Sequence, residues 1–371
     1  MRVALVHDWL LTRGGAERVL DAIWDLYPEA TLYAVLAQAS ALPERAQGRA
    51  VQETWVSRLP RASRWYQRYL PLATWAIEDL DLSAYDLVLS DCSAVSKGVV
   101  TRADTVHVSY IHSPMRYAWD LYHQYRDREA SPWERRFMSP IFSYIRQWDY
   151  AAAQRPDVLI ANSTAVQHRI QKHYRRDSTV IYPPVDVGRF AGEIRPSGDY
   201  WLIISRLVSY KRFDLAVRAC NRLRVPLVIA GEGPERQRLE RMAGPTVRFA
   251  GRVSDEEAAT LVRGCRGLLF PGEDDFGMVM VEVQAAGRPV VAYARGGARD
   301  AVLDGATGCL FQDQSEDALI AAMERALGMD WDAAVIREHA DAFRPERFKE
   351  QFQTVVNSAM QTFGPPSGPP A

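Results

Sequence analysis

The chain has 371 residues, 47% of them hydrophobic and 25% charged, which is typical of a folded globular protein and excludes disorder as its main state. At about 100–200 residues per domain, this length predicts two domains. The 45 basic and 46 acidic residues nearly cancel, which argues against a nucleic-acid-binding protein, because such proteins usually carry a basic excess.

Short apolar runs alternate with longer helical stretches along the chain. Runs that are apolar throughout predict parallel strands covered on both faces, and the stretches between them predict the helices of βαβ units. The predicted strands are Val3–His7, Asp86–Ser90, Val106–Ile111 and Asp157–Ala161 in a first series, and Trp201–Ser205, Pro226–Ala230, Val247–Ala250, Gly267–Phe270 and Pro289–Tyr293 in a second. We therefore expect an α/β protein with two doubly wound parallel-sheet, Rossmann-like domains.

A proline pair within Tyr182–Asp186 separates the two series, and prolines favour an extended linker. The sequence thus predicts an N-terminal domain over residues 1–184 and a C-terminal domain over residues 185–344. A last helix over residues 345–363 is expected to pack back on the N-terminal domain. The Pro- and Gly-rich residues 364–371 are expected to be disordered.

Cysteine usage and hydropathy bear on the cellular compartment. Four separated cysteines without a C-x-x-C pair, each in or beside an apolar run, predict buried free thiols rather than disulfides or a zinc site. The first apolar run meets Asp8 too early for a signal-peptide core, and no run reaches the ~18 apolar residues of a membrane span. We expect a cytoplasmic protein without a bound metal, with contact to the inner face of the plasma membrane left open.

The strongest functional pattern lies in residues 270–297. A predicted strand ends there, acidic residues and Gly277 form a turn, and a helix begins near Met278. Exposed backbone amides at such a helix start can bind a phosphate group. Asp274 and Glu282 can both face a ligand resting on this helix start, although acids near a helix N-terminus can also simply offset the helix dipole.

Three other predicted strand ends in the second series carry glycine or charge. Arg206 and Lys211 follow the strand that ends at Ser205, A-G-E-G-P follows the next strand, and F-A-G-R-V-S the one after. Ligands of open α/β sheets bind at this carboxyl edge, and Arg and Lys suit a diphosphate. Four such loops in succession predict one ligand site.

The N-terminal half carries two motifs at predicted strand ends. Gly14, Gly15 and Glu17 open a helix after the first strand, where glycines let a ligand approach the backbone, although a plain tight turn also explains the pair. The segment Ser109–Asp120 follows the strand Val106–Ile111 and includes His112 with an Arg-Tyr pair beyond it. A lone histidine is more often structural than functional, so a functional role for His112 is indicated only by its position at a strand end and by the Arg-Tyr pair that follows.

Together these motifs resemble the retaining glycosyltransferases of family 4, which have the GT-B fold. S-R-L-x-x-x-K, A-G-x-G-P, F-x-G, and D-x-F-G-x-x-x-x-E with A-x-G-x-P-V-V-A resemble the nucleotide-sugar half of that family, in the right order. G-G-A-E resembles a signature of the same family, and H-x-P-x-R-Y-x-W-D resembles a subgroup of bacterial mannosyl-type transferases that build surface polysaccharides. The chain departs from the family at Asp274 and Asp300, where the family usually or often has glutamate.

The resemblance implies two domains facing across a cleft, with the nucleotide sugar on the C-terminal domain and the acceptor on the N-terminal one. It implies transfer of a hexose, mannose from GDP-mannose above all, to a glycan or lipid-linked acceptor in polysaccharide biosynthesis, with retention and without a metal or cofactor. The implied catalytic residues are His112, Asp274, Arg206 and Lys211. The implied donor-binding residues are Gly15, Arg206, Lys211, Gly251, Arg252, Val253, Asp274, Phe276, Gly277, Met278, Val279 and Glu282, and the implied acceptor-binding residues are Glu17, Arg116 and Tyr117.

Some alternatives stay open at this point. Glu273 and Asp275 flank Asp274, so the sequence does not decide which acid contacts the sugar. A transferase that uses a UDP-sugar, a GT-B epimerase or phosphorylase, and a non-catalytic sugar- or lipid-binding module are the other candidate functions.

Residues 55–75 form a further unusual segment. They contain four arginines and no acid, interleaved with Trp, Tyr and Leu, which is the composition of an interfacial membrane segment. A solvated helix that packs its aromatic side chains inward has the same composition. A lipid-linked acceptor would require a membrane-facing surface, so we expect these residues to contact an anionic membrane.

Overall fold

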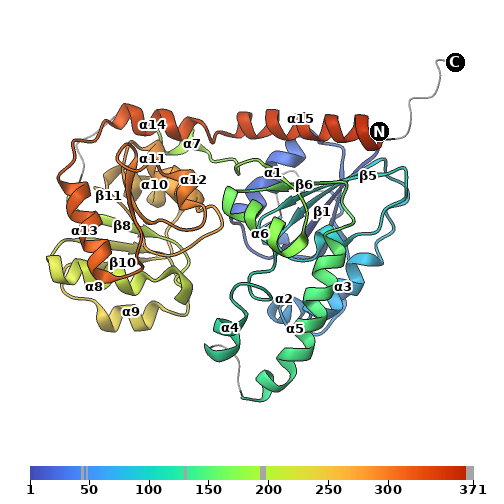
Figure 1. The fold of residues 1–371 in the computed structure, drawn as a ribbon, viewed down its shortest axis with the longest axis horizontal. Helices are drawn as coiled ribbons and strands as arrows, with labels where there is room; N and C mark the ends of the chain where they lie inside the picture. Colours follow the sequence, from blue (N-terminus) through green and yellow to red (C-terminus); the bar gives the residue numbers. More distant parts are fainter. Residues whose placement is uncertain (43–45, 47–48, 129–131, 193–197, 365–371) are drawn as a thin grey trace. The chain divides into compact units, whose positions relative to one another are not determined.

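The computed structural model describes the chain except for residues 43–45, 47–48, 129–131, 193–197 and 365–371. The chain divides into two compact units, the first made of Met1–Tyr182 with Phe348–Ala371 and the second of Pro183–Arg347 (Figure 1). The division after Tyr182 falls within the proline-containing segment where the sequence places a linker. Apart from Gly364, the tail expected to be disordered lies outside the described residues.

The first unit contains a sheet of seven strands, which are β1 (Val3–Leu10), β2 (Thr31–Ala37), β3 (Gln52–Glu53), β4 (Leu87–Cys92), β5 (Val106–Ile111), β6 (Val158–Ala161) and β7 (Thr179–Val180). Their order is β3-β2-β1-β4-β5-β6-β7, and every pair is parallel. The chain first adds strands on one side of β1 and then continues on the other side with β4. The topological switch point, where ligands of open α/β sheets bind, therefore lies between β1 and β4.

Helices cover both faces of this sheet (Figure 1). They are α1 (Gly15–Leu26), α2 (Ala62–Trp65), α3 (Leu70–Glu78), α4 (Tyr122–Arg128), α5 (Pro132–Ala152), α6 (Thr164–Tyr174) and α15 (Pro345–Phe363). Alternate residues of β1 point to opposite faces, so Val3 and Leu5 pack with α1 and α15, whereas Ala4 and Val6 pack with α3 and α5. Helix α15 contributes a buried stripe that begins at Phe348 and Phe352, at the spacing of one helix face.

The second unit contains a parallel sheet of six strands, which are β8 (Trp201–Ile204), β9 (Leu227–Ala230), β10 (Val247–Gly251), β11 (Gly267–Phe270), β12 (Val290–Tyr293) and β13 (Gly308–Phe311). Its helices are α7 (Val187–Phe190), α8 (Phe213–Leu223), α9 (Arg236–Met242), α10 (Asp255–Gly264), α11 (Met278–Ala285), α12 (Ala298–Ala301), α13 (Glu316–Leu327) and α14 (Ala333–Asp341). The strand order β10-β9-β8-β11-β12-β13 places the switch point between β8 and β11. Two doubly wound parallel-sheet units confirm the predicted fold class.

Helix α10 has a well-formed N-cap, and the cysteine prediction is confirmed. Ser254 and Glu257 form a reciprocal capping box at the start of α10. The hydroxyl of Ser254 accepts a hydrogen bond from the backbone amide of Glu257, and the Glu257 carboxylate accepts one from the backbone amide of Ser254. All four cysteines are buried free thiols. In the part of the chain that the structure describes, no helix combines the length and apolar character needed to cross a bilayer.

Candidate functional site

At the switch point of the second sheet, Lys211 joins two of the loops singled out from the sequence. Its ammonium group donates to the hydroxyl of Ser205 at 2.7 Å and to a carboxylate oxygen of Asp274 at 2.9 Å. Ser205 follows β8, and Asp274 lies in the loop after β11. The structure thus brings Lys211 and Asp274 together, while Arg206 lies next to Ser205 with its side chain exposed.

Glycines let these loops approach one another closely. A Cβ atom at Gly272 would lie 2.5 Å from the Cα of Lys211, and one at Gly296 would collide with the carbonyl oxygen of Asp274. The backbone of Gly297 also donates to that carbonyl at 3.0 Å. Tight contact between loops therefore fixes the backbone that carries the Asp274 carboxylate.

Helix α11 begins directly after this loop. Gly277 adopts a left-handed conformation with φ of 82°, which favours glycine, and as the N-cap residue it offers no side chain to the first-turn amides of Met278 and Val279. Phe276 is buried against the ring of Phe343, which anchors the loop. Glu282 lies one turn inside the helix and is mostly buried.

The remaining predicted donor residues of this unit lie at the end of β10. Gly251 has φ of 70° and its carbonyl accepts from the backbone of Gly231 at 2.7 Å, so the ends of β9 and β10 are joined. Arg252 is exposed and Val253 is half-buried. These residues share the carboxyl edge of the sheet with Lys211 and Asp274, as the sequence predicted.

In the first unit, a cluster of titratable side chains occupies the switch point between β1 and β4. Nδ1 of His7 lies 2.9 Å from one carboxylate oxygen of Asp91, and Nε2 of His112 lies 2.6 Å from the other. Glu17, on α1, places a carboxylate oxygen 3.8 Å from Nε2 of His7 and accepts from the backbone of Gly14 at 2.8 Å. The predicted residues Glu17 and His112 are thus linked through His7 and Asp91, which the sequence did not single out.

The other predicted residues of this unit lie nearby in the chain but in different surroundings. Gly15 is exposed in the first turn of α1. The ring of Tyr117 packs edge-on against those of Tyr125 and Phe142. Burial raises the pKa of Tyr117 well above its usual value, so this phenol stays protonated at neutral pH. Arg116 precedes it and is half-buried.

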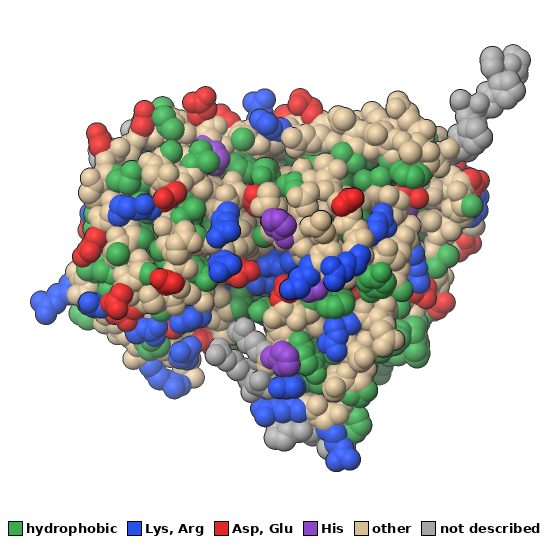
Figure 2. All heavy atoms as spheres, viewed as in Figure 1, with side chains coloured by type: hydrophobic (Ala, Val, Ile, Leu, Met, Phe, Trp, Pro, Cys, Tyr) green, Lys and Arg blue, Asp and Glu red, His purple; other side chains and the backbone are tan. Residues whose placement is uncertain are grey.

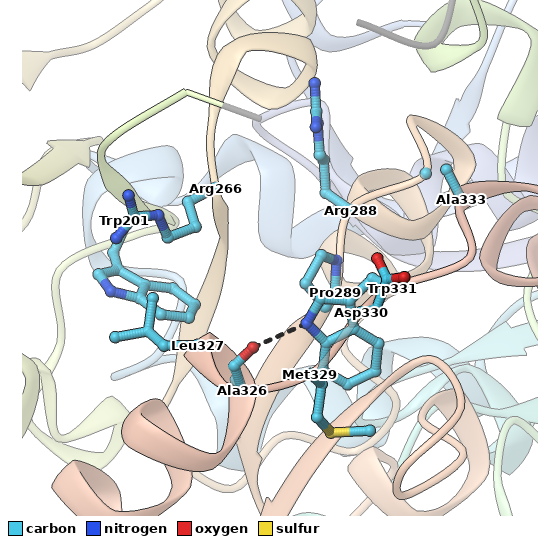
Figure 3. Close-up of a pocket in the computed structure, with 11 residues that line it drawn as sticks. Trp201, Arg266, Arg288, Pro289, Ala326, Leu327, Met329, Asp330, Trp331 and Ala333 are labelled. Carbon is cyan, nitrogen blue, oxygen red and sulfur yellow. Dashed lines mark hydrogen bonds between the residues drawn. The ribbon is translucent and has the colours of Figure 1, made fainter. Parts of the chain in front are cut away.

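A cavity of about 450 Å³ opens elsewhere in the second unit (Figure 3). Trp201 begins β8, and Arg266 and Pro289 directly precede β11 and β12, so the cavity lies at the amino edge of the sheet. The indole of Trp331 donates to the carbonyl of Ala326 at 2.9 Å, and the side chain of Arg288 points away from the other lining residues (Figure 3). This cavity is distinct from the predicted donor site, which occupies the opposite edge.

Both units match family models. Residues 13–189 match the model described as Glycosyltransferase Family 4, and residues 198–329 match the model described as Glycosyl transferases group 1. The two matches together span most of the chain. The chain belongs to the family 4 glycosyltransferases.

Curated relatives of this glycosyltransferase family match parts of the chain. A D-inositol 3-phosphate glycosyltransferase from Geodermatophilus obscurus is 30% identical over 239 residues, covering 55% of this chain and 53% of the relative. The O-antigen chain mannosyltransferase C of Escherichia coli is 25% identical over 238 residues, covering 60% and 59%. The chain spans about half the length of the curated relatives it matches.

Solved structures show the same two-unit GT-B fold. Anabaena Alr3699/HepE in complex with UDP-glucose matches with a TM-score of 0.70 and 18% identity, covering 96% of this chain and all of that one. Sucrose-phosphate synthase from Thermosynechococcus elongatus matches with a TM-score of 0.74 and 17% identity, covering 97% and 100%. At these identities, the likeness establishes the fold alone.

Proposed function

We propose that this family 4 protein is a glycosyltransferase that moves a hexose from a nucleoside diphosphate sugar to a hydroxyl of a glycan or lipid-linked acceptor. The observation that carries the proposal is the contact of Lys211 with Ser205 and Asp274 at the switch point of the second sheet. A cation and a carboxylate are fixed there beside the loop that leads into the start of α11 at Gly277. Such an arrangement suits a diphosphate and the hydroxyls of a sugar.

The proposed chemistry follows from charge development. The leaving diphosphate gains negative charge as the glycosidic bond breaks, and fixed positive groups that meet this charge lower the barrier. Lys211, Arg206 and the first amides of α11 supply those groups, so the proposal needs no resident metal. Retention is proposed to occur by attack of the acceptor on the face that the diphosphate leaves, with the leaving phosphate taking the acceptor proton.

We propose GDP-mannose as the donor. The support is the 25% identity to the O-antigen chain mannosyltransferase C of Escherichia coli, together with the H-x-P-x-R-Y-x-W-D motif at His112–Asp120. A UDP-sugar is the second candidate, because the similar HepE chain binds UDP-glucose. The two donors differ in base as well as sugar, so binding alone can separate them.

A thermal-shift panel of GDP, UDP, ADP and dTDP sugars tests the donor. A ligand at 100 times its dissociation constant should stabilise the fold by about 2.7 kcal/mol, and we expect GDP-mannose to give the largest shift. Incubation of that donor with an acceptor then tests transfer. Tight binding without transfer or hydrolysis would instead support a non-catalytic binding module, and pyridoxal absorbance would support a phosphorylase.

The acidic loop gives a first mutational prediction. We expect Asp274→Asn to lower transfer more than Glu273→Gln or Asp275→Asn, because Asp274 is proposed to bind the sugar and its charge also holds Lys211. Measuring kcat/KM for the three variants with one donor checks the order. If Glu273→Gln proves the most damaging, the sugar contact belongs to Glu273.

The arginine-rich segment 55–75 is proposed to contact an anionic membrane. It is not one helix: a 3₁₀ turn at Trp55–Arg58 is followed by α2 and α3. Tyr66 and Tyr69 pack inward on the core, as the alternative interpretation expected, but Trp75 is 56% exposed. Figure 2 shows Lys and Arg side chains beside hydrophobic ones over the end of this unit that carries α4 and α5.

The membrane proposal rests on four exposed arginines, which are Arg58, Arg61, Arg64 and Arg68. Each contributes at most about 1 kcal/mol near an anionic surface. Changing all four to Gln is expected to abolish most co-sedimentation with anionic vesicles at low salt. Raising the salt to 1 M should weaken wild-type binding as well, because the Debye length falls from about 10 Å at 0.1 M to about 3 Å.

A matched control changes four exposed arginines of the second unit to Gln, at positions 222, 238, 241 and 248. This variant should co-sediment like the wild type. Equal binding by the two quadruple variants would show that net charge, not the segment 55–75, governs the interaction. No binding by the wild type at low salt would overturn the membrane proposal.

A further inference from the structure

Three neighbouring strands of the first sheet bring His7, Asp91 and His112 together. His7 pairs in register with Asp91 across β1 and β4, and Asp91 pairs with Tyr110 across β4 and β5. His112 lies two residues beyond Tyr110 and so points to the same face. This is the face that α1 covers, which explains why Glu17 completes the cluster.

The geometry uses both oxygens of one buried carboxylate. Asp91 and His7 are each 2% exposed, and the two carboxylate oxygens lie 2.9 Å from Nδ1 of His7 and 2.6 Å from Nε2 of His112. Nε2 of His112 is therefore committed to Asp91, and Nδ1 is the ring nitrogen that can serve another partner. On the other side of the His7 ring, Nε2 faces one carboxylate oxygen of Glu17. The second oxygen of Glu17 accepts a hydrogen bond from the backbone amide of Gly14.

Charge complementarity keeps His7 and Asp91 ionised. The groups facing His7 are Asp91 on β4 and Glu17 on α1, while His112, directly after β5, reaches it through Asp91. Burial alone would lower the pKa of His7, but contacts with Asp91 and Glu17 outweigh it and raise that pKa to about 10. Burial would likewise raise the pKa of Asp91, yet His112 and His7 hold it below its usual value.

His107 on β5 provides an internal contrast. It is also completely buried, but it points to the opposite face, where Nε2 lies 2.9 Å from the hydroxyl of Ser90. Without a carboxylate beside its ring, burial lowers the pKa of His107 to about 3. The acids around His7, rather than burial in the sheet, therefore set its charge.

We propose that Asp91 is a positioning residue for sugar transfer, whose carboxylate fixes the ring of His112 and, through His7 and Glu17, the glycine turn at the start of α1. The proposal deepens the proposed function and rests on it. A fixed ring presents Nδ1 of His112 in one orientation, whereas a freely rotating ring would present it only part of the time. The chain of contacts also couples that orientation to the backbone of Gly14.

Activity measurements on Asp91→Asn, which keeps the shape but removes the charge, give the first test. Losing one charge-assisted hydrogen bond predicts a fall of about 10- to 100-fold in kcat, with the KM for the donor changed less than kcat. Ser90→Ala is the matched control, because Ser90 precedes Asp91 on β4 but faces His107, and it should keep wild-type kcat. His7→Gln should lower kcat as well, and the double variant should lower it by less than the product of the two single effects.

Proton NMR of the histidine rings gives a second test that does not depend on activity. In the wild type, the His7 ring should not titrate between pH 5 and 9, whereas in Asp91→Asn its midpoint should move down toward neutral pH. Wild-type kcat in a folded Asp91→Asn protein, or a His7 ring that titrates near neutral pH in the wild type, would overturn the proposal. Absence of transfer by the wild type would contradict the proposed function instead, and the NMR result would still test the cluster.

Discussion

Replacing Lys211 or Arg206 with alanine is expected to remove most sugar transfer while leaving the protein folded. Each side chain is proposed to donate a hydrogen bond to the diphosphate. A charge-assisted hydrogen bond of this kind contributes about 1.5–3 kcal/mol to the stability of the complex. Losing that in the transition state lowers the rate about 10- to 100-fold. Steady-state kcat/KM with one donor and one acceptor measures the loss.

The two variants differ in what else they disturb. Lys211→Ala also removes the partner of Asp274, so its thermal midpoint should be compared with that of the wild type. Arg206→Ala changes an exposed side chain and should leave the midpoint unchanged. Arg222→Ala, an exposed arginine on α8 of the same unit, is the control and should keep full activity. Wild-type kcat/KM in both Lys211→Ala and Arg206→Ala would rule out the proposed contact of these two side chains with the diphosphate.

The sequence predicted the central strands well because they are buried on both faces and apolar throughout. It missed β2 and β13, along with the two-residue strands β3 and β7. The run Thr31–Ala37 is apolar with two alanines and a leucine pair, a pattern that suits a buried helix turn as well as a strand. Pairing with β1 at six positions stabilises this run as a strand. The sequence alone does not show which segments pair with each other.

The sequence predicted those residues of the candidate site that belong to a recognisable motif. Lys211 and Asp274 each stand at a strand end with a recognisable pattern, and parallel topology forces those ends to one edge. His7 and Asp91 carry no such pattern: they are 84 positions apart, and only the reversal of strand order between β1 and β4 pairs them. The same holds for Lys97, which no recognisable motif marks in the sequence.

Lys97 and Asp149 form a buried ion pair whose disruption is expected to be the most destabilising change in the first unit. Lys97 is 1% exposed and Asp149 is 0% exposed, and Nζ lies 2.5 Å from a carboxylate oxygen. The other carboxylate oxygen accepts from the indole of Trp119 at 2.8 Å and the phenol of Tyr174 at 2.9 Å. One carboxylate thus ties α5 to the 3₁₀ turn after β4, to α6 and to the segment after His112.

Lys97→Met leaves the Asp149 carboxylate buried without its cation, which is expected to cost about 3–5 kcal/mol of the free energy of unfolding. Adding Asp149→Asn should recover part of this loss, because the amide oxygen can still accept from Trp119 and Tyr174 while no charge remains. Lys349→Met is the matched control: its pair with Asp25 is partly exposed, so about 1 kcal/mol or less should be lost. Urea unfolding followed by tryptophan fluorescence measures all three, since eight of the ten tryptophans precede residue 183 and report on the first unit. A loss from Lys97→Met no larger than that from Lys349→Met would show that water reaches the Asp149 carboxylate once the lysine is gone.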